Sequence, residues 1–114
     1  MTDGSKNPVM LSDALPSFPE PGLTRQVLLW NERMMLVRHR MQEGWVGARH
    51  SHLHEQLVYV IQGCLRVTVG EKTFEVATGD SFLVPGGIEH QASAMQESDV
   101  LDIFTPFRED YAKG

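Results

Sequence analysis

The stretch "RHSHLHEQLVYVIQG", residues 49–63, decides the fold of this chain. His50, His52 and His54 occupy every second position, and Gln56 continues the series before the chain turns strongly apolar. Side chains two residues apart in an extended strand point to the same face, so two of these imidazoles can share a metal ion. Gln56 offers an amide oxygen from the start of the next apolar strand.

A further ligand comes from much later in the chain. His90 follows the sequence "VPGG", residues 84–87. A ligand that arrives from a second strand is the usual way in which a barrel closes a metal site. The candidate metal ligands are therefore His50, His52, Gln56 and His90; alternatively, the histidines are surface residues or hydrogen-bonded core residues. Imidazole and amide oxygen suit divalent Ni, Fe, Zn, Mn and Co alike.

Two neighbouring residues compete for the fourth ligand position. Glu55 offers a carboxylate, but strand parity favours Gln56, which shares the face of His50 and His52. A neutral amide leaves the charge of a divalent ion uncompensated, so the ion is a stronger Lewis acid and is held less tightly. His54 has the same parity but falls in the connection between strands, so we assign it to substrate binding beside the metal.

The rest of the chain consists of short apolar stretches separated by glycine-containing turns. Stretches such as residues 34–41 and 56–63 have strand character, and no window has helical spacing over three turns. This pattern predicts a single all-β domain, an antiparallel sandwich or small barrel. Residues 1–22 carry four of the six prolines, so we interpret them as an arm that precedes a barrel at 23–114.

Composition excludes several classes of partner. The 114 residues carry a net charge of −5 at pH 7, which disfavours binding to nucleic acid or anionic membranes. The chain has no apolar run long enough to cross a bilayer and no signal pattern at its start. With a single cysteine, Cys64, it forms no intrachain disulfide. We therefore predict a cytoplasmic protein that acts on a small molecule.

Two motifs connect these residues to a family. "GWVGARHSHLHEQLVYVIQG", residues 44–63, resembles the first motif of the cupin superfamily, with Gln56 where the family usually has Glu. "GDSFLVPGGIEH", residues 79–90, resembles the second motif. The positions that fit are Gly44, His50, His52 and Gly63 in the first motif and Gly79, Pro85, Gly87 and His90 in the second. The resemblance implies a cupin double-stranded β-helix, a jelly-roll-like antiparallel barrel of six strands, holding one divalent metal.

The ending "LDIFTPFRED", residues 101–110, narrows the resemblance. Together with "HSHLHEQ", it is similar to the KdgF-type cupins of pectin and alginate breakdown. Those proteins promote the conversion of a 4,5-unsaturated monouronate to a linear ketouronate. The resemblance implies that Asp102, Phe104 and Arg108 line a substrate pocket.

These residue types suit that chemistry on their own account. A carboxylate among apolar neighbours costs several kcal/mol if buried unpaired, so Asp102 either has a partner or cavity access or lies on an exposed edge strand. With access to the cavity it can act as a general acid or base. Arg108 can bind a sugar carboxylate through two parallel hydrogen bonds, and Phe104 can form a wall against the ring. Arg38 is a second candidate for that carboxylate, or lies on a solvated face; His39, on the opposite face, is expected in the core.

Three functions are open at this point. The first is a metal-dependent enzyme, of isomerase or hydro-lyase type, that opens or isomerises an unsaturated uronate or similar sugar acid. The second is an Fe- or Ni-dependent dioxygenase, and the third is a non-catalytic sugar- or metal-binding module. The expected partners are an anionic small-molecule substrate and a second copy of the chain. The arm of residues 1–22 either crosses onto that copy's sheet or is disordered.

Overall fold

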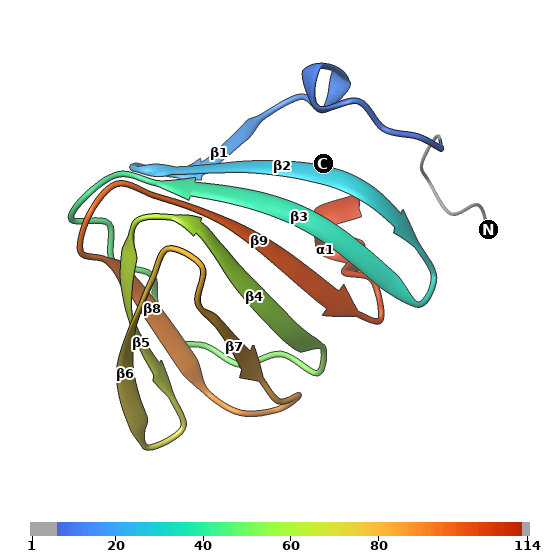
Figure 1. Ribbon diagram of the computed structural model, residues 1–114. Coiled ribbons are helices and arrows are strands. Elements are labelled where there is room, and N and C mark those ends of the chain that lie inside the picture. Colours follow the sequence, from blue (N-terminus) through green and yellow to red (C-terminus); the bar gives the residue numbers. More distant parts are fainter. Residues whose placement is uncertain (1–6, 113–114) are drawn as a thin grey trace.

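The computed structural model describes residues 7–112, in which nine strands form two antiparallel sheets (Figure 1). The six-stranded sheet has the order β1 (Ser17–Glu20), β2 (Leu23–Asn31), β3 (Met34–Met41), β9 (Ser98–Thr105), β4 (Glu55–Gln62) and β7 (Ser81–Val84). The three-stranded sheet has the order β6 (Lys72–Ala77), β5 (Cys64–Val69) and β8 (His90–Ala94). A 3-10 turn, η1 (Leu11–Asp13), and a short helix, α1 (Glu109–Ala112), complete the described chain.

The predicted all-β, single-domain fold is confirmed, with more strands than the six that the resemblance implied. The extra strands include β1 and β2, which extend the larger sheet at its edge, beyond the strands that carry the two motifs. In the described range, no helix is long and apolar enough to cross a lipid bilayer.

Strict alternation sorts the side chains of the central strands. On β4, Val58 and Val60 are buried, whereas Leu57, Tyr59 and Ile61 are exposed on the outer face. The inner residues of both sheets meet in one apolar cluster, which includes Val58 and Val60 from the larger sheet. Burial of these β-branched side chains on one face of each strand therefore holds the two sheets together.

A second, smaller cluster lies at the end of the larger sheet near α1. It is formed by Met35, Val37 and Phe104, with Phe107 packed against it. The ring of Trp30 stacks on Phe107 with centroids 4.7 Å apart. This cluster fixes the segment that follows β9, the chain region that carries Arg108.

The link from β4 to β5 moves the chain from one sheet to the other. Gly63 occupies this link with φ +114°, a backbone conformation that favours glycine. A Cβ at this position would lie 2.6 Å from the backbone oxygen of Glu97. The Gly63 of the first motif is therefore required by a tight crossing and not by the chemistry of the site.

The described part of the N-terminal arm lies along the chain's own sheet. Residues 17–20 pair with β2 as the edge strand β1, a position where Pro19 leaves no internal ladder bond unmade. The side chain of Gln26 also donates a hydrogen bond to the carbonyl oxygen of Ala14 at 2.9 Å. Residues 1–6 of the arm lie outside the described range, and the domain boundary at residues 22 and 23 stays a prediction.

Candidate metal centre

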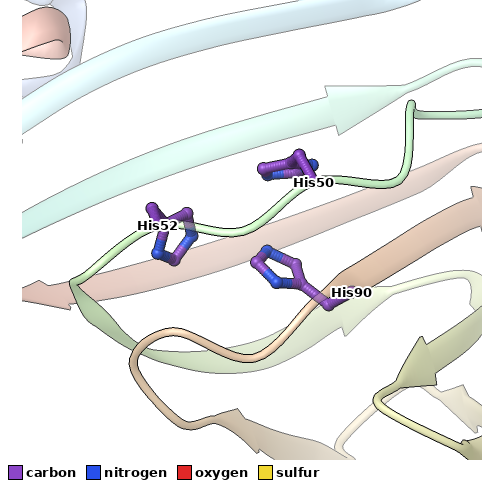
Figure 2. A group of neighbouring side chains, drawn as sticks. All are labelled: His50, His52 and His90. Carbon is purple, nitrogen blue, oxygen red and sulfur yellow. The ribbon is translucent and has the colours of Figure 1, made fainter.

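The loop between β3 and β4 brings His50 and His52 beside His90 at the start of β8 (Figure 2). One ring nitrogen from each histidine lies within 4.8 Å of the other two. His50 and His90 are joined by a backbone bridge in which each amide donates to the other's carbonyl oxygen, at 3.0 and 2.8 Å. The two halves of the cluster, distant in sequence, are thus held together by main-chain hydrogen bonds.

A backbone carbonyl oxygen beside each ring sets the tautomer of all three histidines. Each Nδ1 lies near the backbone carbonyl oxygen of a residue two positions away, at 2.9 Å for His50 and 3.0 Å for both His52 and His90. Because a carbonyl oxygen only accepts, each Nδ1 carries the proton and each neutral ring has its lone pair on Nε2. The Nε2 of His90 is buried and has no hydrogen-bond partner among the described residues. Three neutral rings with their Nε2 lone pairs close together are what a divalent metal requires.

Gln56 adds an oxygen to this set. Its Oε1 lies 3.1 Å from Nε2 of His52, and because His52 Nδ1 already holds the proton, both facing atoms are acceptors. A second proton on the ring is disfavoured, since burial, followed by the charge of Arg108, lowers the pKa of His52. Burial also lowers the pKa of His90. A cation held by both residues would satisfy both acceptors, so the donor set fits a metal.

The structure separates Gln56 from Glu55 as sequence parity predicted. Gln56 lies on the inner face of β4 with Val58 and Val60, whereas Glu55 is exposed on the outer face. The carboxylate of Glu55 therefore points away from the histidines, because adjacent residues of a strand face opposite sides. The role of Gln56 as a ligand stays a prediction, and this placement supports it.

Asp102 is buried, with 3% of its surface exposed, and it has two partners. Its Oδ1 accepts a hydrogen bond from Nε2 of Gln56 at 2.8 Å, and its Oδ2 accepts one from Nδ1 of His39 at 2.7 Å. The exposed-edge alternative is wrong, because β9 lies between β3 and β4 in the centre of the sheet. The expectation that His39 is a hydrogen-bonded core residue is confirmed.

These contacts correct one expectation about charge. The amide of Gln56 is neutral, but it donates a hydrogen bond to the carboxylate of Asp102, so an ion held by Gln56 would have a negative charge behind that ligand. The network continues outward, because Nε of Arg25 donates to Nε2 of His39 at 3.0 Å. Arg25, His39, Asp102 and Gln56 come from β2, β3, β9 and β4, four strands that lie next to one another.

A cavity of about 380 Å³ lies between the two sheets beside this cluster. Its lining includes His50, His90, Gln56, Asp102, Phe104 and Arg108. The structure thus brings the predicted Asp, Phe and Arg to one cavity. The guanidinium of Arg108 lies 5.2 Å from the Phe104 ring centroid and pairs with the Asp110 carboxylate at 3.2 and 2.8 Å.

Arg38 is not brought to this cavity. It lies on the outer face of β3, where its Nε and a terminal nitrogen bind the two carboxylate oxygens of Asp99 at 2.9 and 2.6 Å. The inner position next along the strand is taken by His39, so Arg38 has to point outward. The proposal that Arg38 binds the substrate carboxylate is therefore wrong for this arrangement of strands.

His54 lies beside the cluster, as expected, without joining it. Its ring centroid is 5.6 Å from that of His52 and 6.4 Å from that of Phe104. Its Nδ1 is buried and has no hydrogen-bond partner among the described residues. Its role in substrate binding stays a prediction.

Two residues of the cavity wall were not anticipated from the sequence. Tyr111, on α1, stacks between the guanidinium groups of Arg25 and Arg108, whose central carbons lie 3.8 and 3.9 Å from its ring centroid. Burial raises the pKa of the Tyr111 hydroxyl. Arg25 shares strand parity with the apolar residues Leu23 and Val27. An arginine in such an apolar series was the sequence feature that could have indicated its position in the cavity wall.

The comparisons with known proteins agree with this geometry. Residues 37–104, more than half of the chain, match the cupin domain family, so the chain belongs to that family. An RmlC-like cupin from Shewanella frigidimarina NCIMB 400 has a TM-score of 0.90 and 32% identity, covering 94% of this chain and 96% of that one. KdgF from Halomonas sp. has a TM-score of 0.88 and 29% identity, covering 94% and 99%. The cupin resemblance and the all-β cupin fold are confirmed.

A curated relative gives the same range of identity. The uncharacterized protein SCO3923 of Streptomyces coelicolor is 31% identical over 77 residues, which is 66% of this chain and 73% of that protein.

Proposed function

We propose that this cupin is a metal-dependent enzyme that opens and isomerises a 4,5-unsaturated monouronate, or a similar small sugar acid, to a linear ketouronate. One observation carries the proposal: the three-histidine cluster, the Gln56–Asp102 pair and Arg108 line or adjoin one cavity. The similarity to KdgF from Halomonas sp. supports it.

The residues that would hold the metal are His50, His52, His90 and Gln56. Nickel, iron, zinc, manganese or cobalt in the divalent state suits these ligands. When bound there, such an ion supplies Lewis acidity that polarises an oxygen of the substrate. The Asp102 carboxylate behind Gln56 supplies the compensating charge.

The proposed reaction needs a proton carrier but no redox partner. One proton leaves the anomeric hydroxyl, and the bond from C1 to the ring oxygen breaks with its electron pair remaining on that oxygen. A proton is then added to C4 as the former ring oxygen becomes a ketone, so no atoms are gained or lost. Asp102 is the proposed carrier, because it lines the cavity and each of its oxygens accepts only one hydrogen bond among the described residues.

Arg108 suits the acidic end of such a substrate. Arg108 is partly shielded, with 13% of its side chain exposed, and its present partner Asp110 is 58% exposed. An incoming carboxylate can therefore compete for the guanidinium, which binds carboxylates through two parallel hydrogen bonds. Phe104 lies beneath Arg108 and offers an apolar edge to the sugar ring.

The test follows the ultraviolet absorbance of a 4,5-unsaturated monouronate during incubation with the metal-loaded protein. We expect the enol-ether band to disappear faster with the protein, and the acceleration to be lost in metal-stripped protein and in Asp102→Asn assayed at a saturating metal concentration. Asp99→Asn, on the outer side of the same strand, is the matched control and should keep full activity. Unchanged absorbance with metal-loaded protein overturns the proposal.

The remaining alternatives predict different results in the same experiment. A dioxygenase would leave the uronate unchanged and would consume O₂ with diols or enols. A binding module would bind the sugar acid without turnover, and Asp102→Asn saturated with metal would keep its affinity for the sugar acid largely intact.

Assembly and location remain proposals as well. We propose a homodimer, tested by light scattering on the purified chain. Leu57, Leu83 and Ile103 are 45%, 52% and 39% exposed and adjacent on the outer face of the larger sheet. Leu57→Glu should separate a dimer that forms through this face. A cytoplasmic location, tested by cell fractionation, is also a proposal.

A further inference from the structure

We propose that His39, held by Arg25, is a positioning residue of the metal centre that fixes which atom of the Gln56 amide faces the three histidines. The inference rests on the proposed function only in taking the cluster as a metal site. It assigns no contact between His39 and the substrate or the metal. His39 acts through Asp102, the residue that lies between His39 and Gln56.

The tautomer of His39 follows from its two neighbours. Nε of Arg25 can only donate a hydrogen bond, and it lies 3.0 Å from Nε2 of His39. Nε2 must therefore be the acceptor, and the ring proton resides on Nδ1. That proton is donated to Oδ2 of Asp102 at 2.7 Å. Arg25 is itself held by the ring of Tyr111, 3.8 Å from its guanidinium carbon.

The orientation of the Gln56 amide follows from the same series of hydrogen bonds. The bond from His39 to Oδ2 holds the Asp102 carboxylate so that Oδ1 faces Gln56 at 2.8 Å, and because a carboxylate oxygen only accepts, Nε2 of the amide takes that position. The amide oxygen is then turned toward Nε2 of His52, 3.1 Å away. Rotating the amide by half a turn would place two oxygens together at Asp102, which the carboxylate charge opposes.

This orientation is not the one that the histidine alone would select. In the absence of a cation, the lone pair on His52 Nε2 would be better satisfied by the N–H of the amide than by its oxygen. The hydrogen bonds from Arg25 through His39 to Asp102 enforce the opposite orientation, with the amide oxygen toward His52. It therefore keeps an oxygen ligand presented to the cluster, in the way that residues behind a ligand orient it in metal sites.

The inference predicts a coupling that a general structural role would not produce. If His39 acts only through the amide, then removing the amide removes the effect of His39. His39→Leu should weaken binding of Co²⁺ or Ni²⁺ by about 10- to 100-fold, the range found when a residue behind a metal ligand is lost. In a Gln56→Ala background, the same His39→Leu substitution should have an effect of less than about threefold.

The experiment measures Co²⁺ and Ni²⁺ affinity by chelator competition for the wild-type chain, the two single variants and the double variant. The visible spectrum of bound Co²⁺, which reports its ligands, should change in His39→Leu toward that of Gln56→Ala. His39→Asn keeps a side-chain N–H toward Asp102 and should recover part of the affinity. Arg38→Leu breaks a carboxylate pair at the neighbouring position of β3 and should leave affinity unchanged.

Several results would overturn the inference. Wild-type affinity and spectrum in His39→Leu would do so, as would an equal loss in the presence and absence of Gln56. A wild-type chain that binds neither ion also overturns it. Should His39→Leu fail to fold, the same comparison of single and double variants is made with Arg25→Met in place of His39→Leu, which leaves Asp102 in place. Failure of the uronate assay with an intact coupling would overturn the proposed function alone.

Discussion

Asp102→Asn is the substitution with the most specific expected outcome. The carboxylate accepts N–H groups from both Gln56 and His39, at 2.8 and 2.7 Å, and an asparagine offers only one acceptor oxygen. If His39 keeps that oxygen, the new amide N–H₂ faces the N–H₂ of Gln56. Rotation of the Gln56 amide removes this conflict, because its oxygen then accepts from Asn and its N–H donates to His52.

The expected magnitudes follow from this rotation. The groups that join Gln56, residue 102 and His39 all stay paired in the metal-free variant, so the free energy of unfolding should change by only about 1 kcal/mol, from the loss of charge on two hydrogen bonds. Metal affinity should fall by about 10- to 100-fold, because the ligand oxygen has turned away from the cluster. The two losses should thus be unequal, with the larger one in binding.

Denaturant unfolding of the metal-free protein and chelator competition measure these two quantities. Asp99→Asn, on the outer face of β9, is the control and should alter neither metal affinity nor the cavity. The reasoning is refuted by a variant that binds metal as tightly as the wild type. A loss of more than about 3 kcal/mol in stability without a loss in affinity would refute it equally, since it would mean that the amide does not rotate.

Further predictions concern the ligand set and the fold. Gln56→Glu should tighten metal binding but destabilise the metal-free protein, because it places a second carboxylate beside Asp102; Glu55→Gln should change neither quantity in chelator competition or unfolding. The lowered pKa values of His52 and His90 mean that the unfolded chain binds more protons, so metal-free stability should fall as pH drops below about 6.5 and stay flat above it; urea midpoints across pH 5–8 check this, and a rise on acidification contradicts it. Gly63→Ala should cost more than about 3 kcal/mol in urea unfolding, because its Cβ would lie 2.6 Å from a backbone oxygen.

Much of the fold could be predicted from local patterns. The apolar stretches at 34–41 and 56–63 match strands β3 and β4 to within one residue at each end. Alternation also placed Gln56 on the inner face and Glu55 on the outer one. These results were accessible because period-two burial is a property of a single strand and needs no knowledge of its neighbours.

The histidine cluster was predictable for a different reason. His50, His52 and His90 belong to two motifs with fixed internal spacing, so their meeting followed from resemblance. The structure shows that the two histidines of the first motif lie in a loop and not in a regular strand. Their convergence depends on the backbone bridge between His50 and His90, which alternation does not describe.

What the sequence alone determined was the all-β class, the inner and outer faces of the central strands and the identity of the histidine cluster. What only the tertiary structure decided was which strands are neighbours. Asp102 gained His39 and Gln56 as partners because β9 lies between β3 and β4. Arg38 points away from the cavity because the neighbouring residue on β3, His39, takes the inner position and contacts Asp102. Long-range pairing between strands is set by the packing of the whole sheet, and no single strand's pattern encodes its neighbour.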